Sequence, residues 1–203
     1  MDAIHQFWWN WWVQCAVAIG TFAAVIVALF VSINKPKPLL KVDILREGGE
    51  QTRLTSGEDA RFYHLHVWNE NRSTPATDVQ VCVSRLEEIG PDGKTQDLWL
   101  GDLPLRWRDQ EFVSPRQRMG TARDCDLCMI GKHSGLDLLP LFVPNSMNPH
   151  RQEKCRMVLT VQARSSQVDG ELICIEISWD GIWGDDEGEM KKHFKIEIRE
   201  RTT

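Results

Sequence analysis

The sequence lacks the local motifs that mark the common enzyme classes. It contains no Ser, His and Asp arrangement typical of hydrolases, no paired-carboxylate context, no phosphate-binding loop and no dinucleotide-binding fingerprint. An excess of positive charge is also absent, because the formal net charge is −5 at pH 7. A nucleic-acid groove would need a basic surface. We therefore predict a non-enzymatic protein that takes no cofactor and binds no nucleic acid.

The cysteines do not form the framework of a disulfide-stapled domain. Five of them lie after residue 38, an odd number without regular spacing: Cys82, Cys125, Cys128, Cys155 and Cys174. Disulfides persist in oxidising compartments, so this pattern favours reduced thiols in a cytoplasmic domain. The region 39–203 is long enough for one domain with a proper core.

Charge is missing altogether from residues 13–33, VQCAVAIGTFAAVIVALFVSI. As a helix with about 1.5 Å rise per residue, this stretch would cross the roughly 30 Å hydrocarbon layer of a bilayer. We predict a transmembrane helix here, with residues 1–12 as a short extracytoplasmic N-terminus. Tryptophan favours the headgroup boundary, so we expect an interfacial anchor just before the span, with an aromatic cage for a ligand cation as the alternative. The members of this cluster are Trp8, Trp9, Trp11 and Trp12.

The charges that flank the span predict its orientation. Asp2 is the only formally charged side chain before it, whereas basic residues follow it at Lys35, Lys37, Lys41 and Arg46. Because positive charge stays in the cytoplasm, we expect a single-pass protein of the bacterial inner membrane with its N-terminus outside and its C-terminal domain in the cytoplasm. A secretory signal peptide would need a basic leader, a shorter apolar core and a small-residue cleavage site, which this segment does not show.

The linker 34–38 contains two prolines, which end a helix and favour an extended chain. Beyond it, apolar and polar residues alternate as they do in half-buried strands. The alternating segments are 39–45, 61–69, 78–86, 155–163, 171–179 and 193–200, with two or three shorter ones between 96 and 144. This pattern predicts an all-β domain over 39–203, an antiparallel β-sandwich of immunoglobulin-like or related topology, with a barrel as the alternative. No segment after the anchor shows a convincing 3.6-residue period.

The same alternation assigns the two faces of the predicted strands. The apolar faces, which we expect in the core, carry Val79, Val81, Val83, Ile173, Ile175, Ile177 and Trp179. The opposite faces, which we expect in solvent, carry Gln80, Ser84, Glu176 and Ser178.

A C-x-x-C motif suggests a metal. Cys125 and Cys128, with His133 nearby, are residue types that suit tetrahedral Zn²⁺. A structural zinc site needs a fourth ligand, and His150 and Cys155 do not form a recognisable second pair. These three residues are therefore weak metal candidates, and we favour cysteines that are simply small, buried and apolar. Redox chemistry is less favoured still, because no βαβ context is visible.

Two other groups of potential ligands have simpler interpretations. His64 and His66 are two residues apart, so both point to one face of a strand and with a third ligand could hold a metal. We favour the polar face of an amphipathic strand. The acidic segment 180–189, DGIWGDDEGE, offers carboxylates to calcium but lacks the spacing of a known calcium loop. We expect a solvated hairpin loop in which Trp183 packs back on the domain.

Arginines cluster in the middle of the acidic domain. Guanidinium groups pair well with phosphate, so this stretch is a candidate site for an anionic ligand such as a nucleotide or a lipid headgroup. A solvated charged face is the alternative, because Asp109 and Glu111 partly neutralise it. The members are Arg106, Arg108, Arg116, Arg118 and Arg123.

The anchor itself carries a stripe of small and polar residues at helical spacing. Paired helices in lipid use small residues for close approach and amides for hydrogen bonds between helices. The stripe therefore predicts a homo-oligomer held together through the anchor, with a chance pattern in an alanine-rich span as the alternative. Its members are Asn10, Gln14, Val17, Thr21, Ala24 and Ala28.

Several segments together resemble a group of small bacterial membrane proteins of uncharacterised function. These are IGTFAAVIVALF (19–30), YHLHVWN (63–69), NRSTPA (71–76) and ISWDGIWGDDEGEM (177–190). The resemblance covers most of the chain and implies one N-terminal anchor followed by a cytoplasmic β-sandwich. It implies no catalytic residues.

These observations lead to one functional expectation and two alternatives. We expect a membrane-anchored oligomer whose β-sandwich binds an anionic small-molecule signal or a protein partner. By analogy with single-anchor proteins of bacterial anti-phage systems, one version is an effector that perturbs the inner membrane through a pore. The first alternative is a static scaffold that recruits a cytoplasmic protein through a sheet edge. A metal or redox sensor using Cys125 and Cys128 is the second and weaker alternative.

Overall fold

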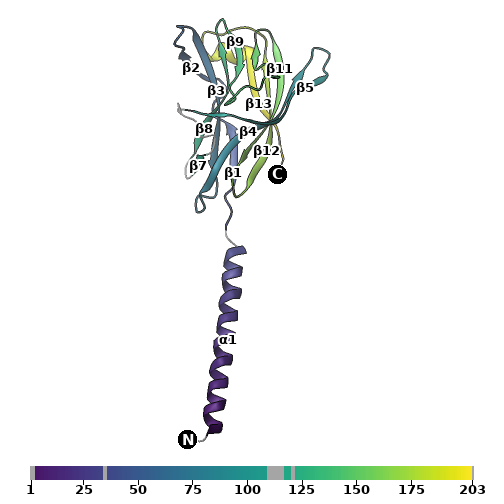
Figure 1. The fold of residues 1–203 in the computed structure, drawn as a ribbon. Coiled ribbons are helices and arrows are strands. Elements are labelled where there is room, and N and C mark those ends of the chain that lie inside the picture. The colour runs from purple at the N-terminus through teal and green to yellow at the C-terminus, as the bar shows by residue number, and fades with distance from the viewer. Residues whose placement is uncertain (1–2, 34–35, 109–116, 120–121, 203) are drawn as a thin grey trace. The chain divides into compact units, whose positions relative to one another are not determined.

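A long N-terminal helix, α1 (Ala3–Ile33), contains both the tryptophan cluster and the uncharged stretch (Figure 1). The computed structural model describes residues 3–33, 36–108, 117–119 and 122–202. The chain divides into two compact units, Met1–Pro36 and Lys37–Thr203. The segment Trp8–Ile33 has a mean hydropathy of 2.6, and its side chains are not buried within the protein. The helix is thus long and apolar enough to cross a membrane.

Local contacts within α1 bear on two of its predicted roles. The indole rings of Trp8 and Trp11 meet edge to face with centroids 6.0 Å apart, and those of Trp11 and Trp12 do so at 5.3 Å. The Thr21 hydroxyl donates a 2.8 Å hydrogen bond to the Val17 carbonyl one turn earlier. This hydroxyl is therefore already satisfied as a donor within its own helix.

The second unit consists of two antiparallel sheets that pack together as a β-sandwich (Figure 1). The seven-stranded sheet has the order β1-β3-β8-β9-β10, with β2 also beside β3 and β6 beside β8. Its strands are β1 (Leu40–Ile44), β2 (Glu50–Arg53), β3 (Asp59–Asn69), β6 (Arg106–Trp107), β8 (Arg123–Gly131), β9 (Gly135–Leu138) and β10 (His150–Arg151). The predicted all-β fold is confirmed.

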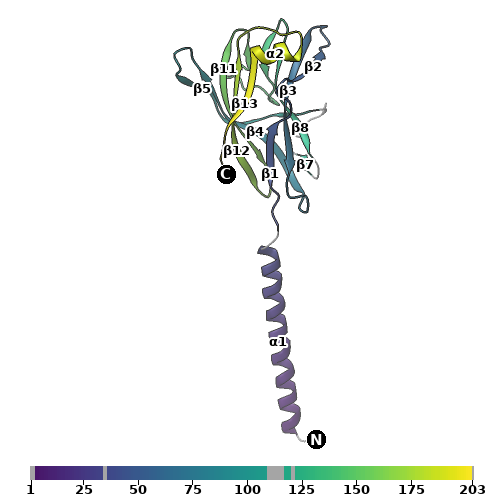
Figure 2. The same cartoon turned by 180° about the vertical axis from the view of Figure 1, so that it is seen from behind.

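The six-stranded sheet has the order β13-β12-β11-β4-β5, with β7 beside β4. Its strands are β4 (Ala76–Ile89), β5 (Thr95–Pro104), β7 (Gln117–Met119), β11 (Cys155–Arg164), β12 (Asp169–Trp179) and β13 (Phe194–Thr202). A short helix, α2 (Glu187–His193), precedes β13 and lies at the end of the domain that carries β2 (Figure 2).

The core lies between the inner faces of the two sheets. Every side chain that alternation assigned to the core of β4 and β12 is at least 95% buried, which confirms that prediction. The largest fully buried side chains include Tyr63, whose ring lies 4.1 Å from that of Phe194 across the sandwich. Met190 of α2 is also fully buried, so the short helix closes part of this core.

Glu176 corrects the prediction for the outer faces. Gln80, Ser84 and Ser178 are half-buried on the outside of the six-stranded sheet, but Glu176 is only 4% exposed. It forms ion pairs with Arg156 and Arg199, which flank it on the neighbouring strands. The methylene stems of these arginines can cover a carboxylate while their charges stay wet. Alternation correctly placed Glu176 on the outer face of the sheet, but it did not predict that two arginines would bury its carboxylate.

An ion network joins the two sheets along one edge. Glu171 of β12 accepts a 3.1 Å hydrogen bond from Lys41 Nζ of β1 and a 2.8 Å one from Arg201 Nη1 of β13. Arg201 also donates to the Val42 carbonyl at 3.0 Å. Since β1 and β12 belong to different sheets, Glu171 ties the two sheets of the sandwich together at this edge.

Candidate functional site

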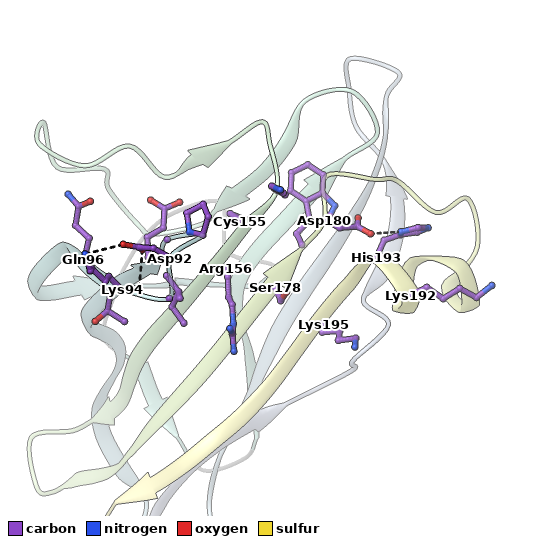
Figure 3. A pocket seen from close by; sticks show the side chains of 18 residues that line it. Asp92, Lys94, Gln96, Cys155, Arg156, Ser178, Asp180, Lys192, His193 and Lys195 are labelled. Carbon is purple, nitrogen blue, oxygen red and sulfur yellow. Dashed lines mark hydrogen bonds and ion pairs between the residues drawn. The ribbon is translucent and has the colours of Figure 1, made fainter.

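A cleft of about 1100 Å³ opens on the outer face of the six-stranded sheet (Figure 3). Its floor is the start of β11, the end of β12 and the start of β13. One wall is the β4–β5 hairpin, residues 88–96, and α2 forms the opposite side through Lys192 and His193. The cleft thus draws on four segments that are far apart in the sequence.

Charge is distributed unevenly in this cleft. The carboxylates that line it each have a basic partner: Glu88 with Arg151 at 3.3 Å, Asp92 with Lys94 at 3.3 Å, and Asp180 with His193 at 2.8 Å. Three lining lysines, in contrast, form no ion pair with any described residue: Lys154, Lys192 and Lys195. The surplus charge of the cleft is therefore positive, although the chain as a whole is acidic.

The strand register places three donors in a row across the floor. Arg156 of β11 is paired with Ser178 of β12, and Ser178 is paired with Lys195 of β13. Figure 3 shows these three residues on the three neighbouring strands. Adjacent strands are about 4.8 Å apart, so a guanidinium, a hydroxyl and an ammonium group lie within reach of one small ligand.

The deep side of the cleft is apolar, and its thiol is unreactive at neutral pH. Cys155 and Trp179 line it but are only 8% and 5% exposed. Burial raises the pKa of the Cys155 thiol to about 11, so the thiol stays protonated at neutral pH. A protonated thiol is a poor nucleophile. The polar groups that the cleft presents are therefore the donors of its floor, and the Cys155 thiol is not among them.

The predicted arginine site includes residues of both sheets. Arg106 and Arg108 lie on or next to β6 and Arg123 on β8 of the seven-stranded sheet, whereas Arg118 lies on β7 of the other sheet. Arg108 Nη2 is 2.7 Å from a Glu50 carboxylate oxygen, so part of its charge is neutralised. The remaining member, Arg116, lies outside the described residues.

The weak zinc candidates lie apart from one another. Cys125 and Cys128 are both fully buried between the sheets, and burial raises the pKa of both thiols well above the usual value. His133 is exposed in the β8–β9 turn, where its backbone N–H donates to Glu58 at 2.6 Å. Among the described residues, no group of three or more His, Cys, Asp or Glu side chains is arranged to hold a metal ion.

The two histidines of β3 lie side by side on the outer face of the seven-stranded sheet. His64 Nδ1 is 2.9 Å from Asp126 and His66 Nδ1 is 2.7 Å from Asp124, each across the register of β8. His64 is nevertheless 94% buried, so this position is more covered than a solvated polar face would be.

The segment 180–189 is a loop only as far as Asp186. Asp186 caps α2 by accepting a 2.8 Å hydrogen bond from the Glu189 backbone N–H, so the prediction of a hairpin loop is wrong from Glu187 onward. Trp183 packs against the core as expected, and the Arg61 guanidinium lies 6.0 Å from its ring centroid. Asp185 is bound to Lys132 at 2.7 Å.

The fold and the cleft define a β-sandwich domain with an N-terminal apolar helix and a basic surface cleft. Comparison with protein-family models and with the curated proteins finds no match to this chain. Sequence reasoning missed the cleft because its lining residues come from segments far apart in the sequence and share no local motif.

Proposed function

We propose that the protein is a non-enzymatic, membrane-anchored binding module that receives an anionic ligand in the cleft of its β-sandwich. The observation that carries the proposal is the set of three lysines, Lys154, Lys192 and Lys195, that line a cleft whose carboxylates are already paired. An unpaired positive charge in a concave site favours an anion through direct attraction and through steering.

The N-terminal helix α1 supports the membrane location and the self-association that we propose. The length and hydropathy of α1 support a single membrane crossing, which we assign to the bacterial inner membrane, and the flanking charges support a cytoplasmic domain. Asn10 and Gln14 support self-association, because amides can hydrogen-bond between helices in lipid. Thr21 contributes less as a donor, since its hydroxyl is bonded to Val17.

The experiment measures binding of pyrophosphate and of citrate to the full-length protein in detergent by titration calorimetry. We expect at least one of the two anions to bind. Lys154→Glu and Lys195→Glu should each weaken binding by about tenfold or more, since one reversed charge a few ångströms away is worth about 1 to 3 kcal/mol. Lys191→Glu is the matched control, because Lys191 lies on α2 but is paired with Glu187 at 3.0 Å. If neither anion binds, or the control loses as much affinity, the cleft is no anion site.

A scaffold is the second candidate function, and one edge of the six-stranded sheet supports it. Strand β5 pairs with β4 alone among the described strands and carries Leu100, which is 63% exposed. Such an edge can accept a strand from a partner. Membrane potential separates a scaffold from a pore-forming defence effector: depolarisation that is lost in Asn10→Leu and Gln14→Leu favours the effector.

A further inference from the structure

The row of donors on the cleft floor has a fixed direction and spacing. Met157, Ile177 and Ile196, the next residues along the three strands, are buried in the core. Because side chains alternate along a strand, Arg156, Ser178 and Lys195 all point out into the cleft. Arg156 and Lys195 stand on either side of Ser178, so a group placed over the hydroxyl can contact all three.

A buried carboxylate orients Arg156 before any ligand arrives. The Arg156 Nε–H donates to Glu176 Oε1, and the Glu176 side chain is only 5% exposed. This hydrogen bond uses one edge of the guanidinium and leaves its two terminal nitrogens for another acceptor. Arg199 forms an ion pair with the second oxygen of Glu176, so the carboxylate has a guanidinium on each side. A guanidinium held in this way loses less conformational freedom when it binds a ligand.

The shape of this donor set distinguishes among anions. A planar carboxylate has two oxygens, and when a guanidinium fork takes one lone pair of each, the remaining lone pairs lie in the plane of the fork. A phosphoryl group has three peripheral oxygens in tetrahedral arrangement, so it can take the fork and still accept from the serine hydroxyl and the lysine. Resting on the proposed function, we infer that the ligand carries a phosphoryl group, bound over Ser178 between Arg156 and Lys195.

Neighbouring charges limit where that group can sit. Glu197 of β13 is paired with Glu176 in the next row of the sheet, and it is exposed. An anion placed one row further from the rim would meet this carboxylate, whereas at the Ser178 row it meets Lys195 and lies within the cleft that Lys154 also lines. The position over Ser178 is therefore the favourable one.

Calorimetry on the full-length protein in detergent tests the inference by comparing pyrophosphate with citrate. Arg156→Lys keeps the charge but removes the fork, and Ser178→Ala removes the hydroxyl. We expect each variant to weaken pyrophosphate binding by about tenfold and citrate binding by less than about threefold, as for loss of a charge-assisted hydrogen bond. Arg164→Lys is the control. Arg164 lies on the outer face of β11, as Arg156 does, but its guanidinium is bound to Asp102 at 2.7 Å.

Glu176→Gln tests the positioning role separately. Its readout is the ratio of pyrophosphate to citrate affinity, which a general loss of stability would not change. We expect this ratio to fall in Glu176→Gln and to stay constant in the Arg164→Lys control. An unchanged ratio in Arg156→Lys, Ser178→Ala and Glu176→Gln, together with loss of both anions in Lys195→Glu, would overturn the phosphoryl inference and leave the anion site standing. If neither anion binds, both the proposed anion site and the phosphoryl inference are refuted.

A second arm identifies the source of the phosphoryl group. The protein is placed in nanodiscs of phosphatidylcholine alone or with added phosphatidic acid, and pyrophosphate binding is measured in both. Competition by phosphatidic acid assigns the site to a lipid headgroup, whereas equal binding in both discs assigns it to a soluble phosphorylated molecule. A pyrophosphate affinity that is equal in wild type and Arg156→Lys in both discs contradicts the inference.

Discussion

Replacing Glu171 by glutamine should destabilise the sandwich without disturbing its core. The carboxylate accepts hydrogen bonds from Lys41 at 3.1 Å and from Arg201 at 2.8 Å, and its side chain is only 8% exposed. A hydrogen bond to a charged group is worth about 1.5 to 3 kcal/mol when buried. Both partners are 27 to 38% exposed and can regain water, so we expect a total loss of about 2 kcal/mol.

The loss should depend on pH in a defined direction. Burial raises the pKa of Glu171, but hydrogen bonds from Lys41 and Arg201 outweigh it and hold the pKa below the usual 4.5. A carboxylate with a lowered folded-state pKa stabilises the protein above its unfolded pKa and stops doing so as the pH falls through the folded value. The difference between wild type and Glu171→Gln should therefore be full at pH 7 and shrink below pH 4.5.

Thermal unfolding of the full-length protein in detergent, followed by tryptophan fluorescence, measures this effect. For a domain of this size about 2 kcal/mol corresponds to a drop of about 4 to 8 °C in Tm. Glu200→Gln is the control, because Glu200 is exposed on β13 and forms no ion pair with the described residues. A Tm difference for Glu171→Gln that is as large at pH 3 as at pH 7 would refute the reasoning.

Two further predictions concern the backbone and the thiols. Gly49→Ala should lower the urea midpoint of unfolding more than Gly57→Ala does. Both glycines have a positive φ, but only at Gly49 would an added Cβ lie within 3 Å of neighbouring atoms. Equal midpoints for the two variants would contradict this prediction. At pH 8, Cys125 and Cys128 should resist alkylation in the native protein and react in urea, as site-resolved mass spectrometry can show, because burial raises the pKa of both. Rapid native labelling of either thiol would show that the core opens there.

The strands could be predicted wherever alternation was unbroken. Strands β4, β11, β12 and β13 followed from it, because one face of each is buried and the other is not. Strand β8 was missed, since the register shift opposite Tyr63 and His64 leaves Leu127 and Cys128 both buried in succession. A bulge of this kind breaks the period of two.

Helix α2 escaped prediction for a different reason. It spans only Glu187–His193 and buries one side chain, Met190, so no period can be read from it. The signal that could have found it is local, since an Asp followed three residues later by Glu is typical of a helix N-terminus. Asp186 and Glu189 have that spacing.

The cleft could not be predicted, because it depends on long-range pairing. Arg156, Ser178 and Lys195 come together only through the registers of three strands. The arginine cluster is the opposite case. Its members are close in sequence, yet Arg106 and Arg118 are carried into different sheets.

The same strand register of β12 builds both the apolar core and the donor row of the cleft. In the native register Met157 opposes Ile177 inside the sandwich while Arg156 opposes Ser178 outside it. A slip of one residue would turn every side chain of a strand to the other face, so it would dismantle the apolar interior and the donor row together. A wrongly paired chain would thus fail to bind the proposed phosphoryl ligand, and binding would show that the three strands are paired in the native register.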